Sequence, residues 1–303
     1  MSLDAPEKAD SPVVHAIPRR YAALGVIVLA IILVGALIVI RNHDNQANGT
    51  SDVETITPAP ASLITSVGHV PASISSAVGV TSPDAPITPP TATGNTALWQ
   101  SAATGAGAGA GVRPVVFFYG AEFAPYAAAE RWPVVVALSR FGTFSALGLM
   151  QSASSVGFSD TPTFTFWQVG YSSVWVDLQE VERYGSLNPT GGGFMPLQEP
   201  TARQAASVAV YDSSTMTFPL LDIANHYALV GSSFTPSLLG GLSQSQVAAD
   251  LLIPASPVAQ AILASANEIT AAICTVTGQR PAAVCNAHGV DLADAKMGIN
   301  KAG

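Results

Sequence analysis

Charged side chains are scarce in this chain, and basic ones are the scarcer. Only 11% of the 303 residues are charged, and 12 Lys and Arg stand against 20 Asp and Glu, which gives a formal net charge of −8. Beyond residue 41 the basic residues are scattered singly, so no basic patch is available to bind phosphates. We therefore expect no nucleic-acid partner.

Long apolar runs are also absent, with one exception at residues 21–40. This segment reads YAALGVIVLAIILVGALIVI, and a helix of that length matches a hydrocarbon core of about 30 Å. Three basic residues precede it and one follows closely: Lys8, Arg19, Arg20 and Arg41. This asymmetry predicts a single transmembrane helix in the lipid bilayer with a cytoplasmic N-terminus. The alternative is a cleaved signal peptide, but the apolar run is long for one and no A-x-A site follows it.

Composition divides the rest of the chain. Residues 1–20 mix charge, Pro and Ser and are expected to be a cytoplasmic tail. Residues 41–111 are rich in Ser, Thr, Pro, Ala and Gly and predict a flexible linker, although short apolar pieces such as Ser62–Val67 leave local docking open. Residues 112–303 have the pattern of a packed domain, which the membrane topology places outside the cytoplasm, in the cell envelope.

The order of expected elements predicts an α/β domain with a mixed central sheet flanked by helices. A buried strand at Val115–Gly120 leads into a helix that begins at Pro125, contains Pro133 and ends in a glycine cap at Gly142. Further strands are expected at 145–151, 163–167 and 173–181, a helix at 198–210, a hairpin turning at Asn225–His226, and helices opening at Ser243 and Ser256.

Cysteine is almost absent, since Cys274 and Cys285 are the only two. In an oxidising compartment this close pair predicts a structural disulfide, which would stabilise the fold by about 3 kcal/mol. A relocated redox pair is one alternative, but no basic cluster that would activate a thiol is visible nearby. A zinc site is the other, and it would need His288 and Asp291 to join both cysteines.

Residues 119–133 carry a specific resemblance to a known family. Their sequence, YGAEFAPYAAAERWP, is similar to the YGAEFCPYCAAERWP motif of a prokaryotic family of thioredoxin-like proteins, the domain of unknown function 929. The later segments TPTFTFW, PLLDIANHYALVG, LSQSQVAADL and ICTVTGQRPAAVC also resemble that family, so the resemblance covers nearly all of 113–287. It implies a thioredoxin-like fold and a lineage of thiol–disulfide oxidoreductases.

The chain departs from this family where its chemistry would occur. Ala124 and Ala127 stand in place of the two motif cysteines, and alanine offers no nucleophile and no metal ligand. Dithiol exchange at this position is therefore excluded, and no catalytic residue, cofactor or metal is expected. The kept residues Pro125, Tyr126 and Trp132 predict instead a binding surface for an envelope protein or peptide. The alternative function is an oxidoreductase inactivated naturally or by engineering.

Thioredoxin folds also hold a cis-proline opposite the redox helix, where it binds extended substrate backbone. Pro219, which directly precedes the expected hairpin, is predicted to have this role and to join the binding surface. Pro162 is the rival, because it also begins a strand. Glu122 and Glu130 flank the motif and are expected on a solvated helix face, with an acid–base pair as the alternative.

Overall fold

A computed structural model describes residues 56–84, 86–102, 111–186, 193–211 and 217–300. The predicted cytoplasmic tail and the transmembrane helix at 21–40 lie outside these residues. Within the described ranges, one helix is long and apolar enough to span a bilayer, Pro257–Val276, and 89% of its apolar window is buried inside the structure. It has the burial of a core helix.

The central sheet is mixed, as the sequence predicts, and is built around strand β4 (Val112–Gly120). Residues 115–118 of β4 are fully buried. The strand pairs in parallel with β7 (Asp177–Glu182) and antiparallel with β8 (Leu220–Ile223). Strand β8 continues into β9 (Tyr227–Val230), and the predicted turn lies between them. Two short strands, β2 (Thr91–Ala92) and β3 (Gln100–Ala102), pair with β9 and β4.

A second, three-stranded sheet has the order β1 (Thr57–Pro58), β5 (Gly142–Gln151) and β6 (Pro162–Ser173). Gly142 is the first residue of β5, so the predicted helix cap at this glycine is wrong. A Cβ atom there would lie 2.3 Å from the carbonyl oxygen of Ser172 on the paired strand. The glycine is required by this close strand approach.

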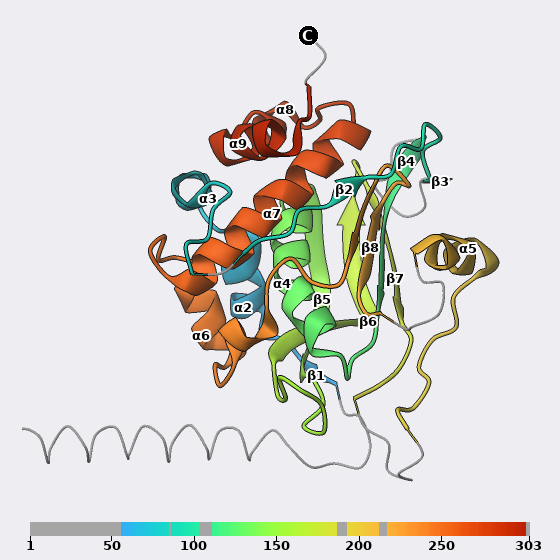
Figure 1. The fold of residues 1–303 in the computed structure, drawn as a ribbon, viewed down its shortest axis with the longest axis vertical. Coiled ribbons are helices and arrows are strands. Elements are labelled where there is room, and N and C mark those ends of the chain that lie inside the picture. Colours follow the sequence, from blue (N-terminus) through green and yellow to red (C-terminus); the bar gives the residue numbers. More distant parts are fainter. Residues whose placement is uncertain (1–55, 85, 103–110, 187–192, 212–216, 301–303) are drawn as a thin grey trace, which may run out of the picture. The chain divides into compact units, whose positions relative to one another are not determined.

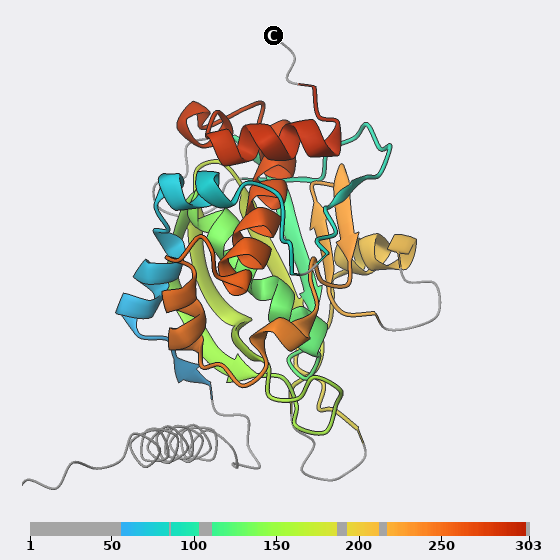
Figure 2. The ribbon, with the colours of Figure 1, turned by 60° about the vertical axis from the view of Figure 1, so that its left-hand side comes forward.

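Helices cover both faces of the central sheet (Figure 1). Helices α4 (Pro125–Ser139) and α7 (Pro257–Val276) lie on one face, and α5 (Ala202–Tyr211) lies on the other. Further helical elements in the C-terminal part are η1 (Pro236–Leu239), α6 (Gln244–Asp250), α8 (Ala282–Cys285) and α9 (His288–Met297). Helix α9 packs on α7, as Figure 2 also shows, which places His288 in a folded element.

The flexible linker predicted over 41–111 is wrong for residues 56–84 and 86–102, which pack on the domain. This N-terminal segment forms β1, α2 (Ala61–Gly68), α3 (Ala72–Val78), β2 and β3. Val67 of α2 is fully buried, and the Asn267 side chain of α7 donates to the carbonyls of Ser75 and Gly79, at 3.1 and 2.6 Å. The low charge and the short apolar runs of the segment allow this docking. The alternative of local docking for pieces such as Ser62–Val67 is confirmed.

Candidate binding site at the start of helix α4

Ala124 and Ala127 lie at the N-terminus of α4, directly after the central strand. Ala124 is the N-cap residue and Pro125 occupies the first turn, as the sequence predicts. Ala124 is 5% exposed and Ala127 is fully buried, and no side chain caps this helix end. Neither alanine side chain offers a nucleophile or a metal ligand, so neither can carry out thiol chemistry.

The loop between β4 and α4 is held from both sides by backbone hydrogen bonds. The amide of Arg183 donates to Gly120 O, and that of Glu122 donates to Tyr184 O, both at 2.8 Å. On the other side the amide of Ala153 donates to the carbonyl of Phe123 at 3.1 Å. The pairing of β4 with β7 thus continues into the loop and fixes where α4 begins.

A buried ion pair lies beneath this loop. Arg131 of α4 donates through Nε and Nη2 to the Glu182 carboxylate, at 2.9 and 2.6 Å, and both side chains are fully buried. Arg131 Nη2 also donates to Ala121 O at 3.2 Å. A Cβ atom at Gly120 would lie 3.0 Å from Glu182 Oε2, so a glycine at this position keeps room for the carboxylate. The ion pair therefore joins helix, strand and loop.

Aromatic side chains surround the start of α4. Phe123 stacks on Phe194 with ring centroids 3.8 Å apart, and its ring also lies 6.4 Å from that of Tyr184. Tyr126 meets Phe158 edge to face at 5.9 Å. Tyr126 and Phe158 are 43% and 44% exposed, and the other three are partly exposed. We call these five residues, Phe123, Tyr126, Phe158, Tyr184 and Phe194, the aromatic surface.

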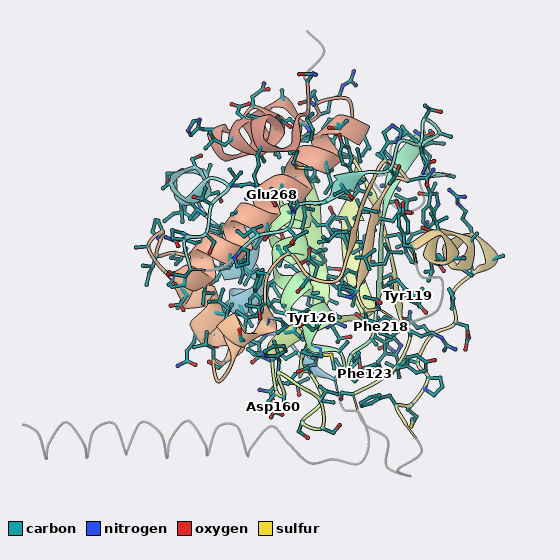
Figure 3. All side chains as sticks on the ribbon, in the orientation of Figure 1. Tyr119, Phe123, Tyr126, Asp160, Phe218 and Glu268 are labelled. Carbon is teal, nitrogen blue, oxygen red and sulfur yellow. A yellow bond between two sulfur atoms is a disulfide. The ribbon has the colours of Figure 1, made fainter. Side chains whose placement is uncertain are left out.

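The structure brings Pro219 to the same place. Phe218 lies edge to face with Phe123 at 5.9 Å, so the start of β8 lies beside the start of α4. Figure 3 shows Phe123, Tyr126 and Phe218 toward one end of the ribbon, whereas Glu268 lies apart from them on α7. The Phe218–Pro219 bond is cis, as predicted, and the rival Pro162 is not among the cis prolines of the described residues.

Three of the four residues predicted to bind a partner are buried. Trp132 is fully buried and its Nε1 donates to Pro162 O at 2.8 Å, so the predicted contact of its indole with a partner is wrong. A tryptophan on a buried helix face fills the core and needs one hydrogen-bond acceptor for its ring N–H. Pro125 and Pro219 are buried as well and lie below the surface. Tyr126 is the predicted residue that remains open to contact.

Glu122 and Glu130 are both fully buried, so the solvated helix face predicted for them is wrong. Thr165 donates to Glu122 across to β6. Glu130 accepts from the amide and hydroxyl of Ser233, at 2.6 and 3.0 Å. Loss of hydration on burial raises the pKa of Glu130 to about 8. The two carboxyls bond to different elements, which gives no geometric support to an acid–base pair.

Cys274 and Cys285 form the predicted disulfide, with Cα atoms 5.6 Å apart. The bond joins α7 to α8 and consumes both thiols. The zinc alternative with His288 and Asp291 is therefore wrong, because neither sulfur is available as a thiolate ligand. A redox role for this pair would require the buried disulfide to be reduced and oxidised again.

Sequence reasoning missed four of the five aromatic residues of the surface. Phe123 lies inside the motif at residues 119–133, but nothing in the motif marks its side chain as a contact. Phe158, Tyr184 and Phe194 come from segments whose sequences show no periodicity, and the three glycines directly before Phe194 do not mark a site. Their clustering depends on where β6, β7 and α4 bring those loops, which a linear pattern does not contain.

Fold and site together define an α/β domain with a mixed sheet and a sulfur-free helix start ringed by aromatic side chains. Residues 109–190 match the model of a family described as Domain of unknown function (DUF929). The match includes β4, α4 and β7, whereas the resemblance noted over 191–287 remains a prediction. No curated protein and no solved structure matches the chain.

Proposed function

We propose that this protein is a membrane-anchored, non-catalytic binding module with a thioredoxin-like fold, displayed in the cell envelope. The order of connections supports the fold. Helix α4 follows β4 and leads on to the parallel partner β7, while β8 and β9 add antiparallel strands after α5. Pro219 directly precedes β8, where such folds place their substrate-binding proline.

One observation carries the binding role: the aromatic surface lies around a helix start that has no chemistry of its own. Tyr126 and Phe158 are exposed to more than two fifths although they are aromatic. Tyr and Phe rings supply large contact areas at low entropic loss, which makes such positions frequent anchors of protein interfaces. The partner expected here is an envelope protein that inserts apolar side chains between these rings.

Site-specific photocrosslinking in intact cells tests this function. A photoreactive phenylalanine analogue at position 126 should give one dominant crosslinked species, and the same analogue at Val210 of α5, which is 68% exposed, serves as the control. Phe158→Ser should reduce the yield at position 126 several-fold. Equal crosslinking from positions 126 and 210, or a yield that Phe158→Ser leaves unchanged, would contradict a specific interface.

The transmembrane anchor has a separate test. A cysteine introduced at Ser2 should be protected from a membrane-impermeant maleimide in intact cells, because the N-terminus is proposed to be cytoplasmic. A cysteine at exposed Ala282 should react, because the domain is proposed to lie outside. Labelling of position 2 alone would reverse the proposed orientation.

The second candidate is an inactivated thiol–disulfide oxidoreductase, and the position of the two alanines favours it. They occupy the N-cap and the first turn of α4, where the helix dipole would lower the pKa of an introduced thiol. The double variant Ala124→Cys and Ala127→Cys should then reduce insulin in the presence of dithiothreitol. An insulin reduction rate equal to that of the parent protein would mean that this site no longer supports dithiol exchange even when both cysteines are present.

A further inference from the structure

A pocket of about 120 Å³ lies at the opposite end of α4 from the aromatic surface. Its walls come from α3, α7, α8 and the start of α9. Ala124 and Arg140 cap the two ends of α4, and the rise of an α-helix separates them by roughly 24 Å. The pocket is therefore a separate feature from the aromatic surface.

Arg140 brings a positive charge into this pocket. Its guanidinium donates through Nη1 to Thr270 Oγ1 at 2.8 Å and through Nη2 to Ser75 Oγ at 3.3 Å, and both acceptors are neutral hydroxyls. Among the described residues no carboxylate forms an ion pair with it. Loss of hydration lowers the pKa of Arg140 to about 10, so it is charged at neutral pH. The Arg140 side chain is partly buried, and the pocket lining that the structure describes contains no acidic residue, so an anion bound there would meet no competing carboxylate.

The start of α9 faces the same pocket. Ala287, which is the N-cap of this ten-residue helix and carries no side-chain cap, lines the pocket together with Gly289 and Val290. The partial positive charge of a helix N-terminus adds to the field of Arg140. Asp291 in the same turn opposes it in part. Gly289 is required, because a Cβ atom would lie 2.7 Å from Nδ2 of Asn267.

Asn267 adds a second polar group to the pocket lining. This side chain is 1% exposed, and its Nδ2 atom is fully used by the two carbonyls of α3 and the residue after it. Its Oδ1 atom has no hydrogen-bond donor among the residues that the structure describes. This oxygen can only accept a hydrogen bond, so it would bond to a donor such as water and not to the oxygens of an anion.

The rest of the lining is apolar and narrows the choice of ligand. Val70, Val284 and Val290 line the pocket together with three alanines. A phosphate ion would press its unpaired oxygens against these side chains, which is unfavourable, whereas an alkyl chain would bury apolar surface. A cavity of about 150 Å³ holds benzene, so this pocket has room for about three or four carbon atoms.

The geometry points to a binding site for a short aliphatic carboxylate, with Arg140 as the counter-charge and the valines around the alkyl chain. Such a ligand would bring its negative charge to Arg140, the one charged residue in the described pocket lining, and its alkyl chain to the apolar lining residues. Because α8 forms one wall and the Cys274–Cys285 bond ties it to α7, reduction of the disulfide should weaken binding.

Isothermal titration of the full chain in detergent micelles with sodium butyrate tests the site, with sodium acetate, phosphate and chloride as matched probes. Butyrate should bind with a dissociation constant on the order of 1 mM. Acetate should bind roughly tenfold more weakly, because it buries two fewer methylene groups. Absence of butyrate binding, or phosphate binding as tightly as butyrate, would overturn the inference.

Two variants separate the pocket from the fold. Ala283→Leu fills the pocket from α8 without changing any charge and should abolish butyrate binding, whereas Ala282→Leu on the same helix, also exposed but outside the lining, should leave it unchanged. Arg140→Gln should weaken binding at least tenfold, although it also alters the bonds to Thr270 and Ser75. Butyrate binding that Ala283→Leu leaves intact would place the ligand elsewhere and refute the site.

Discussion

Replacement of Glu130 by Gln should remove a large part of the pH dependence of folding stability. Burial raises the pKa of this carboxyl from 4.5 to about 8, and a shift of that size corresponds to about 5 kcal/mol. Between pH 4.5 and about pH 8, the two pKa values, the Glu130 carboxyl of the folded protein keeps a proton that the unfolded chain releases. The contribution is therefore fully favourable below about pH 4.5 and is lost as the pH rises toward 8.

The expected difference can be measured by urea unfolding followed through tryptophan fluorescence. Between pH 5 and pH 8 the parent protein should lose about 3 to 4 kcal/mol of unfolding free energy through Glu130 alone. In the parent protein the Ser233 amide donates to Glu130 Oε2 at 2.6 Å, and Glu130→Gln keeps an oxygen to accept this bond. The variant should not show the pH-dependent loss of unfolding free energy that comes from Glu130. Burial also raises the pKa of Glu180, to about 7, but that group is common to both proteins.

Glu199→Gln is the matched control, because that side chain is 74% exposed and its ion pair with Arg183 lies at the surface. Glu199→Gln should change the unfolding free energy by little at every pH and leave its dependence on pH unchanged. The reasoning would be refuted if the difference in unfolding free energy between the parent and Glu130→Gln stayed constant from pH 5 to pH 8.

Three further variants should behave as follows. Glu182→Gln leaves the buried Arg131 without its carboxylate and should lower the unfolding free energy by about 3 to 5 kcal/mol, measured in urea. Replacement of Cys274 and Cys285 by Ser should lower it by about 3 kcal/mol, and reducing agent should then have no further effect on the melting temperature. Val67→Ala should lower the unfolding free energy by about 1 to 2 kcal/mol, because Val67 is buried. Val210→Ala, at an exposed position, should lower it by less than a quarter of that amount.

Local patterns predicted much of the fold. The capping box at Ser243 and Gln246 was readable because it depends on residues three apart, and in the structure Gln246 Oε1 accepts from the Ser243 amide at 2.8 Å. The β8–β9 hairpin was readable because Ala224 and Asn225 adopt left-handed φ angles in the turn, a conformation for which Asn is a frequent choice.

Long-range contacts were not readable. The docking of the N-terminal segment depends on Asn267, which bonds to carbonyls nearly two hundred residues earlier in the chain. The burial of Trp132 depends on the carbonyl of Pro162, on another element. Residues 56–102 are poor in charged side chains. This composition fits both a flexible linker and a segment that packs against apolar helices, so it could not distinguish the two.

The N-terminal segment also restricts how a partner can bind. Strand β1 pairs with β5 and strand β2 pairs with β9, so each of these two strands already has a neighbour from the segment. Exposed sheet edges are common sites for the addition of an extended peptide, and the segment occupies these two. Recognition by side chains at the aromatic surface is therefore favoured over strand addition at β5 or β9. A partner bound in this way should lose affinity when Tyr126 or Phe158 is replaced, and should be indifferent to substitutions along the solvent side of β9.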